Sequence, residues 1–181
     1  MTDTPTEHPK NRRIDRVLGA SFVEDLGGLS LEDLRARRDD ALAEREYLSM
    51  LRRLLQGRAE ILAAELAARA SPDEQAPLVE RLTAVLAGDD HPTTSRGEVV
   101  RVSIPEEEML LARRRVERMA ADVGLSDLSE LDDARLGEVV ETLAVEEHEV
   151  SSLRREVIRV LDTLQDELKR RYRDDPTLAL R

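Results

Sequence analysis

Residues 136–168 read LGEVVETLAVEEHEVSSLRREVIRVLDTLQDEL, and this stretch decides the fold. Its residues follow the 4-3 spacing of a coiled-coil seam, apolar at both ends and charged in the middle. The same spacing recurs 102 residues earlier in the chain, in a stretch that aligns helix on helix with the first. The later seam comprises Leu136, Val140, Leu143, Glu147, Val150, Arg154, Val157, Leu161, Leu164 and Leu168. The earlier seam comprises Leu34, Arg38, Ala41, Arg45, Leu48, Arg52, Leu55, Ala59, Leu62 and Leu66.

A repeated word, Ser-x-Leu-Arg-Arg, occupies the middle of each stretch, at residues 49–53 and again at residues 151–155. Each copy places an arginine, Arg52 or Arg154, at a seam position where a coiled coil is normally apolar. A buried arginine without a partner costs several kcal/mol, on the order of the desolvation of one charge. The charged seam positions therefore need partners, either inside the protein or in a ligand.

The composition favours an all-α protein. Only 2% of the 181 residues are aromatic, so the core must be built from Leu, Val, Ile and Ala, which suit helix–helix packing. A helix of about forty residues is a rod of about 60 Å, and connecting helices of about 25 Å are too short to retrace it. We therefore expect an antiparallel coiled coil of two long helices with additional shorter helices.

The chain divides into five segments by its helix signals. Ser30 and Asp33 form a capping box that starts the first long helix, and Ser71-Pro72 ends it. Pro105 begins a shorter helix that Gly124 closes, after another short helix over 72–87. We expect an extended segment at 98–104. The segments are a flexible N-terminal part with a short amphipathic helix (1–29), the first long helix (30–70), a connecting region with two shorter helices (71–131), the second long helix (132–172) and a tail (173–181).

The segment 13–29 is amphipathic, with Ile14, Leu18, Phe22 and Leu26 at i,i+4 spacing, but glycines interrupt it. It is too short to be a stable helix alone. Two interpretations remain open: the segment folds back onto the body of the protein, or it docks into the groove of a partner.

Composition also excludes several function classes. The absence of cysteine and the three scattered histidines argue against disulfides and a metal site, and favour a cytoplasmic protein. No apolar run approaches the roughly 18 residues of a membrane span. A net charge of −11 argues against direct binding of nucleic acid and favours a basic protein partner. Because no nucleophile–base pair, carboxylate dyad or phosphate loop is visible, we expect no enzyme and no catalytic cofactor.

The charged seam positions allow two interpretations. In the first, Arg45 and Arg52 pair internally with Glu147, and the charges only set the register of the coil. In the second, they bind an anionic ligand that carries bases, because arginine can fork onto phosphate or guanine and can stack on a base. Hydroxyl and carboxylate residues beside each arginine favour the second interpretation. The candidate ligand-binding residues are Ser49, Arg52, Arg53, Gln56, Glu60, Glu147, Ser151, Arg154, Arg155 and Asp162.

The two patches also imply a symmetric site. They lie near the centres of two helices of similar length, so antiparallel pairing makes them face each other across an approximate two-fold axis. A pseudo-two-fold site suits a two-fold ligand. Cyclic di-GMP, with two guanines and two phosphates, is such a ligand.

At these residues the chain resembles the cyclic-di-GMP-dependent anti-sigma factors of the RsiG type, which hold the sporulation sigma factor WhiG. That family carries the helix motif E-x3-S-x2-R-x3-Q-x3-D once in each strand of an antiparallel coiled coil. The first copy here reads Arg45-x3-Ser49-x2-Arg52-x3-Gln56-x3-Glu60, and the second reads Glu147-x3-Ser151-x2-Arg154-x3-Ile158-x3-Asp162. Arg45 and Ile158 depart from the motif, and Glu60 is a conservative change.

The resemblance implies a function. It implies that the coil clasps a dimer of intercalated cyclic di-GMP, and that the liganded form sequesters a WhiG-like sigma factor. It also leads us to expect that residues 13–29 dock on that sigma factor. The alternative is a structural coiled-coil adaptor whose seam charges only set register.

Overall fold

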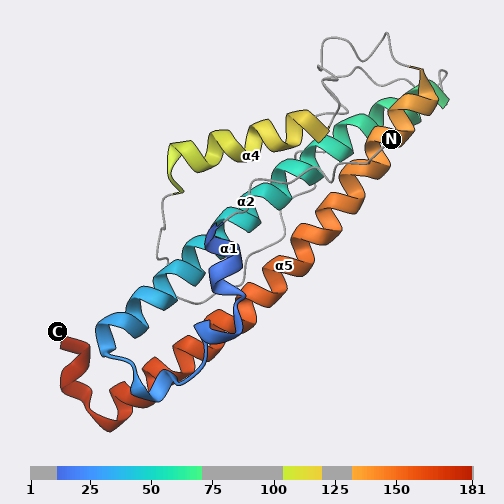
Figure 1. The fold of residues 1–181 in the computed structure, drawn as a ribbon. Helices are drawn as coiled ribbons and strands as arrows, with labels where there is room; N and C mark the ends of the chain where they lie inside the picture. The colour runs from blue at the N-terminus through green and yellow to red at the C-terminus, as the bar shows by residue number, and fades with distance from the viewer. Residues whose placement is uncertain (1–11, 71–103, 120–131, 181) are drawn as a thin grey trace, which may run out of the picture. The chain divides into compact units, whose positions relative to one another are not determined.

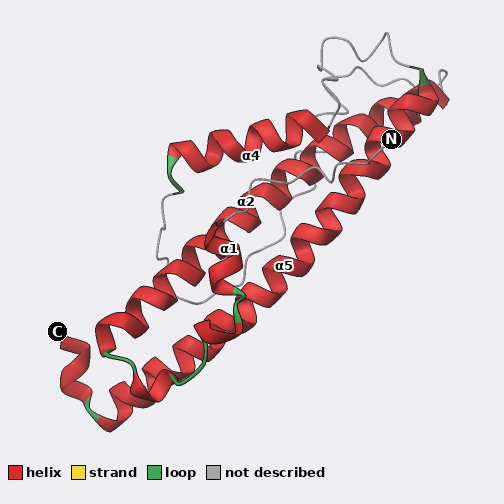
Figure 2. Ribbon diagram, in the orientation of Figure 1, coloured by secondary structure: helices red, strands yellow, loops and turns green. Residues whose placement is uncertain are grey.

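The computed structural model describes residues 12–70, 104–119 and 132–180. Within these ranges the chain forms helices and loops and no strand, which confirms the all-α prediction (Figure 2). The elements are α1 (Arg12–Val17), η1 (Ala20–Phe22), η2 (Leu26–Gly28), α2 (Leu31–Ala70), α4 (Glu106–Met119), α5 (Asp133–Asp174) and η5 (Pro176–Leu180). Across the same residues, no helix is both long enough and apolar enough to cross a membrane.

The two long helices begin where their sequence signals lie. Before α2, the backbone N–H of Asp33 donates to Ser30 Oγ at 3.0 Å, and Ser30 Oγ donates to the Asp33 carboxylate at 2.6 Å. This is the predicted capping box, and the described part of α2 runs to Ala70, so the predicted end at Ser71-Pro72 lies outside the described residues. Before α5, Asp132 Oδ1 accepts the backbone N–H of Arg135 at 2.7 Å. The α5 helix continues to Asp174, two residues past the predicted end of the segment.

Several predicted elements lie outside the described residues. They include the N-terminal residues 1–11, the short helix over 72–87 and nearly all of the extended segment. The helix predicted to begin at Pro105 is α4, whose described part is Glu106–Met119.

The chain divides into two compact units. Unit 1 comprises Met1–Glu46 and Ser152–Arg181, and unit 2 comprises Tyr47–Ser151. In unit 1 the first part of α2 packs against the last part of α5. Arg35 Nε donates to Tyr172 Oη at 3.0 Å, and its Nη2 donates to the carbonyl of Leu178 at 2.8 Å.

In unit 2 the last part of α2 packs against the first part of α5, and α4 lies along α2 (Figure 1). Arg69 Nη1 bonds Asp133 Oδ1 at 3.1 Å, whereas Arg52 bonds Glu147. The later residue on α2 thus pairs with the earlier residue on α5. The long helices therefore pack antiparallel, as predicted.

On α2, half of the predicted seam forms the core, and on α5 most of it does. On α2 the positions seven residues apart from Leu34 to Leu62 are at most 3% exposed. The predicted positions Arg38, Arg45 and Arg52 instead lie at the rim of the core, with about a third of each side chain exposed, 34%, 32% and 33%. The expectation that the seam buries these arginines is therefore wrong. The buried neighbours on α2 are Glu44, Tyr47 and Leu51.

A third element packs on the helix pair of each unit, and it explains why the buried residues of α2 differ from the predicted seam. A helix packed on one side of a helix pair widens the buried stripe on that side and leaves the other side at the surface. In unit 2 that element is α4, which buries Ala112 and Val116. In unit 1 it is residues 12–29, named here the N-terminal strap, which buries Val17 and Phe22.

The N-terminal strap folds back onto unit 1, which was the first of the two interpretations of this segment. Arg13 Nε donates to Glu44 Oε2 at 2.6 Å, and Glu44 is fully buried. Arg37 Nη1 donates to the carbonyl of Phe22 at 2.7 Å, and its guanidinium lies over the Phe22 ring, 5.7 Å from the centroid. Both arginine contacts fasten the strap to unit 1.

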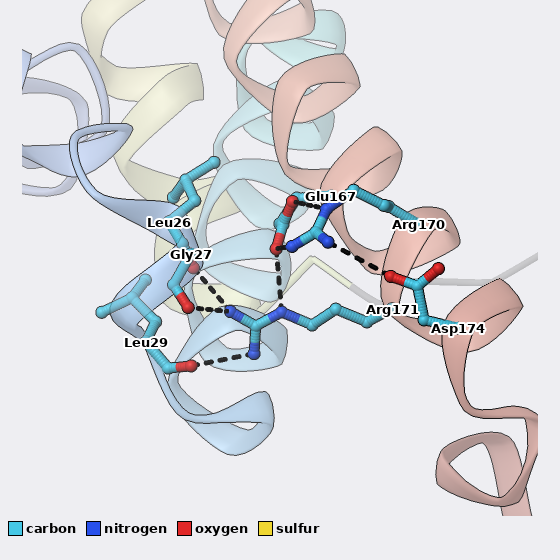
Figure 3. A network of polar contacts seen from close by, with 7 residues as sticks. All are labelled: Leu26, Gly27, Leu29, Glu167, Arg170, Arg171 and Asp174. Atoms are coloured by element: carbon cyan, nitrogen blue, oxygen red, sulfur yellow. Dashed lines mark hydrogen bonds and ion pairs between the residues drawn. The ribbon is translucent and has the colours of Figure 1, made fainter.

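The end of the N-terminal strap is held by Arg171 of α5 (Figure 3). Its guanidinium donates to the carbonyls of Leu29 at 2.8 Å and Leu26 at 2.6 Å, while Arg171 Nε donates to Glu167 at 2.9 Å. Glu167 also accepts from Arg170 at 2.7 and 2.8 Å. Hydrogen bonds from Arg170 and Arg171 lower the pKa of Glu167 to about 2, so it holds both arginines as a carboxylate at neutral pH.

Candidate ligand-binding site

Three of the candidate residues meet in unit 2. Glu147 Oε1 on α5 accepts Ser151 Oγ from the next turn at 2.9 Å and Arg52 Nη1 from α2 at 3.4 Å. These three residues are named the Arg52 cluster. It combines the arginine of the first motif copy with the carboxylate and the hydroxyl of the second copy.

The Arg52–Glu147 contact is long, and its side chains are 33% and 24% exposed. A partly exposed ion pair at this distance contributes little to folding, about 0–1 kcal/mol. The structure therefore contains the Arg52–Glu147 pair of the internal-pairing interpretation as a long, partly exposed contact. In unit 1, Arg45 bonds Glu46, the next residue along the chain.

The other candidates on α2 differ in position. Ser49 and Gln56 are partly exposed and lie about one turn before and after Arg52, on the same side of the helix. Glu60 is exposed one turn further on. Arg53 is exposed and lies about 100° around the helix from Arg52, so the structure does not bring it into the Arg52 cluster.

The remaining candidates on α5 belong to unit 1. Arg154 is partly exposed and follows Ser151 by three residues on the same helix. Arg155 is exposed, and its Nη2 donates to Ser152 Oγ at 2.9 Å. Asp162 is also exposed, whereas Ile158, which replaces the glutamine of the motif, is only partly exposed.

A second pair of charges holds α5 from the side away from the Arg52 cluster. Glu146 bonds Arg115 of α4, whereas the next residue, Glu147, bonds Arg52 of α2. Consecutive residues point about 100° apart on a helix, and the buried Leu143 and Val150 lie between these two directions. The α4 helix therefore covers one side of the core stripe, and the Arg52 cluster lies on the other side.

The contact between α4 and α2 also involves charge. Burial lowers the pKa of Arg58, and the nearby carboxylate of Glu117 opposes that shift. Sequence reasoning missed Arg58, Arg115, Glu117 and Glu146. They stand outside the repeated word, and no motif marks which of the many charged residues of α4 meet the long helices.

The described ranges contain no group of three or more histidine, aspartate or glutamate residues that could hold a metal ion. The available chemistry is that of guanidinium, hydroxyl and carboxylate groups. Such groups bind anions and hydrogen-bonding bases.

Comparison with known proteins identifies the family. A model of the RsiG-like family matches residues 20–86 and 122–180, which is most of the chain, and the chain belongs to this family. No curated protein matches. The family membership confirms the resemblance found in the motif and supports an anti-sigma role. Residues 87–121, which include α4, lie outside the matched ranges.

Proposed function

We propose that this protein is an anti-sigma factor that binds cyclic di-GMP between its two long helices and, when liganded, sequesters a sporulation sigma factor of the WhiG type. The observation that carries this proposal is the Arg52 cluster. There the arginine of one motif copy donates across two helices to the carboxylate of the other copy, and that carboxylate also accepts from a serine hydroxyl on its own helix. Membership of the RsiG-like family supports the same function.

The chemistry of the Arg52 cluster suits a guanine nucleotide. Arg52 can donate to phosphate or to guanine O6 and N7. The Glu147 carboxylate can accept from the N1–H and N2–H groups of guanine. Binding thus replaces the weak Arg52–Glu147 contact with two stronger contacts to the ligand. In one, Arg52 donates to an acceptor of the ligand, and in the other Glu147 accepts from its N–H groups.

This exchange can act as a switch. A ligand that binds only the folded arrangement stabilises it by about 2.7 kcal/mol when its concentration is 100 times its Kd. If that arrangement also binds the sigma factor, ligand and partner affinities are coupled, and each raises the other by the same factor. The net charge of −11 suits a partner that is basic on its DNA-binding face.

Titration calorimetry with cyclic di-GMP tests the proposal. Wild-type protein is expected to bind, and Arg52→Ala and Glu147→Gln are each expected to weaken binding by at least about tenfold, because each removes a charged hydrogen-bonding partner of the ligand. Arg135→Ala is the control, since Arg135 is an exposed arginine of α5 that pairs with Glu138. It is expected to bind like wild type.

Arg154→Ala extends the test to the second motif copy and is also expected to weaken ligand binding by at least about tenfold. Circular dichroism of every variant checks that helicity is unchanged. If wild-type protein at high concentration gives no heat with cyclic di-GMP, the proposal is wrong.

A structural adaptor is the second candidate function. It is favoured by the Arg52–Glu147 contact, which could serve only to set register. In that case Arg52→Ala would change the stability or register of the coil, and cyclic di-GMP would bind neither to the wild-type protein nor to the variant.

A further inference from the structure

Two consecutive carboxylates on α5 are held by arginines from two different helices. Glu146 bonds Arg115 of α4, and Glu147 bonds Arg52 of α2. Glu146 is the more buried of the two, with 13% of its side chain exposed. The two contacts lie on opposite sides of the core stripe of α5.

The α4 helix contacts both long helices of unit 2. On the α5 side, Arg115 bonds Glu146, and on the α2 side the Glu117 carboxylate acts electrostatically on Arg58. Between these contacts, Ala112 and Val116 are buried. The helix therefore carries an ion pair to α5 on one side, a carboxylate that acts on an arginine of α2 on the other, and buried apolar residues between them.

We propose that α4 is a brace for the Arg52 cluster, and that Arg115 is a positioning residue that acts on the ligand site through Glu146. The inference rests on the proposed function. Arg115 fixes the rotation of α5, and this rotation directs Glu147 and Ser151 toward Arg52. Because α4 lies on the opposite side of the core stripe, it does not occupy the space where a ligand would meet the Arg52 cluster.

The burial of Glu146 makes loss of its ion pair with Arg115 costly. A carboxylate as buried as that of Glu146 lowers the stability of the fold when it has lost its arginine. Loss of the Arg115 contact therefore favours a rotation of α5 that brings Glu146 to water. Such a rotation would also turn Glu147 away from Arg52. The α4 helix lies outside the residues that match the RsiG-like family, whereas Glu146 lies within them.

Charge reversal tests the brace through ligand affinity. Arg115→Glu and Glu146→Arg are each expected to lower the affinity for cyclic di-GMP by about tenfold, because each places like charges in contact. The double variant restores the opposite pair and is expected to bind within about threefold of wild type. Arg114→Glu is the matched control, since Arg114 is the exposed neighbour of Arg115 on α4.

Spin labels provide a second readout that needs no ligand. The chain has no cysteine, so Ala63→Cys and Glu141→Cys place two labels at exposed positions of α2 and α5 in unit 2. The distance distribution between the labels is expected to be narrow in the wild-type background. Arg115→Glu should broaden or shift it, and the double reversal should restore it.

The outcomes separate the two proposals. If the labelled wild-type protein does not bind cyclic di-GMP but the distances respond to Arg115→Glu, the ligand proposal fails and α4 still fixes the helix pair. If Arg115→Glu changes neither distance nor affinity, the brace is wrong. A loss of affinity that the double reversal does not restore also contradicts it.

Discussion

At the scale of the residue, Glu44 is a charged side chain buried completely in unit 1. A carboxylate in this position requires a cation, and Arg13 of the N-terminal strap supplies one at 2.6 Å. This pair ties the beginning of the described chain to the middle of α2. It also explains how a strap that is too short to be a stable helix acquires a defined place.

Arg13→Ala is expected to lower the free energy of unfolding by about 2 kcal/mol, because it removes the Arg13 partner of a buried carboxylate. Arg16→Ala is the matched control, since Arg16 bonds Asp40 at 2.8 Å in a pair with both side chains exposed. Its effect is expected to be at most about 1 kcal/mol. Urea denaturation followed by circular dichroism measures both, and equal effects would show that the burial of Glu44 is unimportant.

Two helix glycines offer a stabilising change at the same scale. Gly57 of α2 and Gly137 of α5 lie inside long helices, and a Cβ added at either position has no atom within 4 Å. Alanine at each position is expected to raise the free energy of unfolding by about 0.5–1 kcal/mol, because glycine loses more backbone entropy in a helix. Thermal and urea melts measure the gain, and a destabilised Gly137→Ala would contradict the open space at that position.

At the scale of the element, each unit consists of a helix pair with a third element on one side. The N-terminal strap occupies that role in unit 1, and α4 occupies it in unit 2. This arrangement explains why the arginines of the predicted α2 seam remain at the rim. The apolar stripe is widened toward the third element, so the arginines on the opposite side keep contact with water.

The end of the N-terminal strap is expected to loosen in acid. The pKa of Glu167 is lowered from 4.5 to about 2 by its bonds to Arg170 and Arg171, so its contribution to stability is complete above about pH 4.5. That contribution is lost as the pH falls toward 2, when the protonated carboxyl no longer holds Arg171 beneath the strap.

Glu167→Gln removes this dependence. Its free energy of unfolding is expected to lie below that of wild type at pH 5, and the difference is expected to shrink by pH 3. Urea titrations at both pH values measure it. Glu138→Gln, in an exposed pair with Arg135, is the control and is expected to leave the pH dependence of stability as in wild type. A constant difference between Glu167→Gln and wild type would show that Glu167 is not the responsible group.

At the scale of the whole molecule, the negative net charge should strengthen binding of the proposed sigma factor. With a net charge of −11, binding of a basic sigma factor is expected to weaken as salt rises from about 50 to 300 mM, because salt screens charges at the surface. Copurification with the sigma factor, with and without cyclic di-GMP and at both salt concentrations, measures this. Retention without ligand equal to retention with ligand would contradict a ligand-dependent anti-sigma factor.

Deletion of residues 1–29 tests whether the N-terminal strap binds the sigma factor or stabilises unit 1. The sequence suggested a segment that docks on the sigma factor, whereas Arg13, Arg37 and Arg171 fasten it to unit 1. We expect the deletion to lower the melting temperature, because it uncovers the buried Glu44. An unchanged melting temperature with weakened sigma binding would favour the docking interpretation.

From the sequence alone, the helical class, the start of α2 and the antiparallel pairing of α2 with α5 could be predicted. These follow from an aromatic content of 2%, a capping box and heptad spacing in two long helices. The tertiary structure was needed to decide which seam positions are buried, that Glu44 is a core residue and that Arg115 holds Glu146. The physical reason is that burial at a seam depends on what packs against the helix pair from outside, and neither the N-terminal strap nor α4 carries a sequence signal for the side on which it packs.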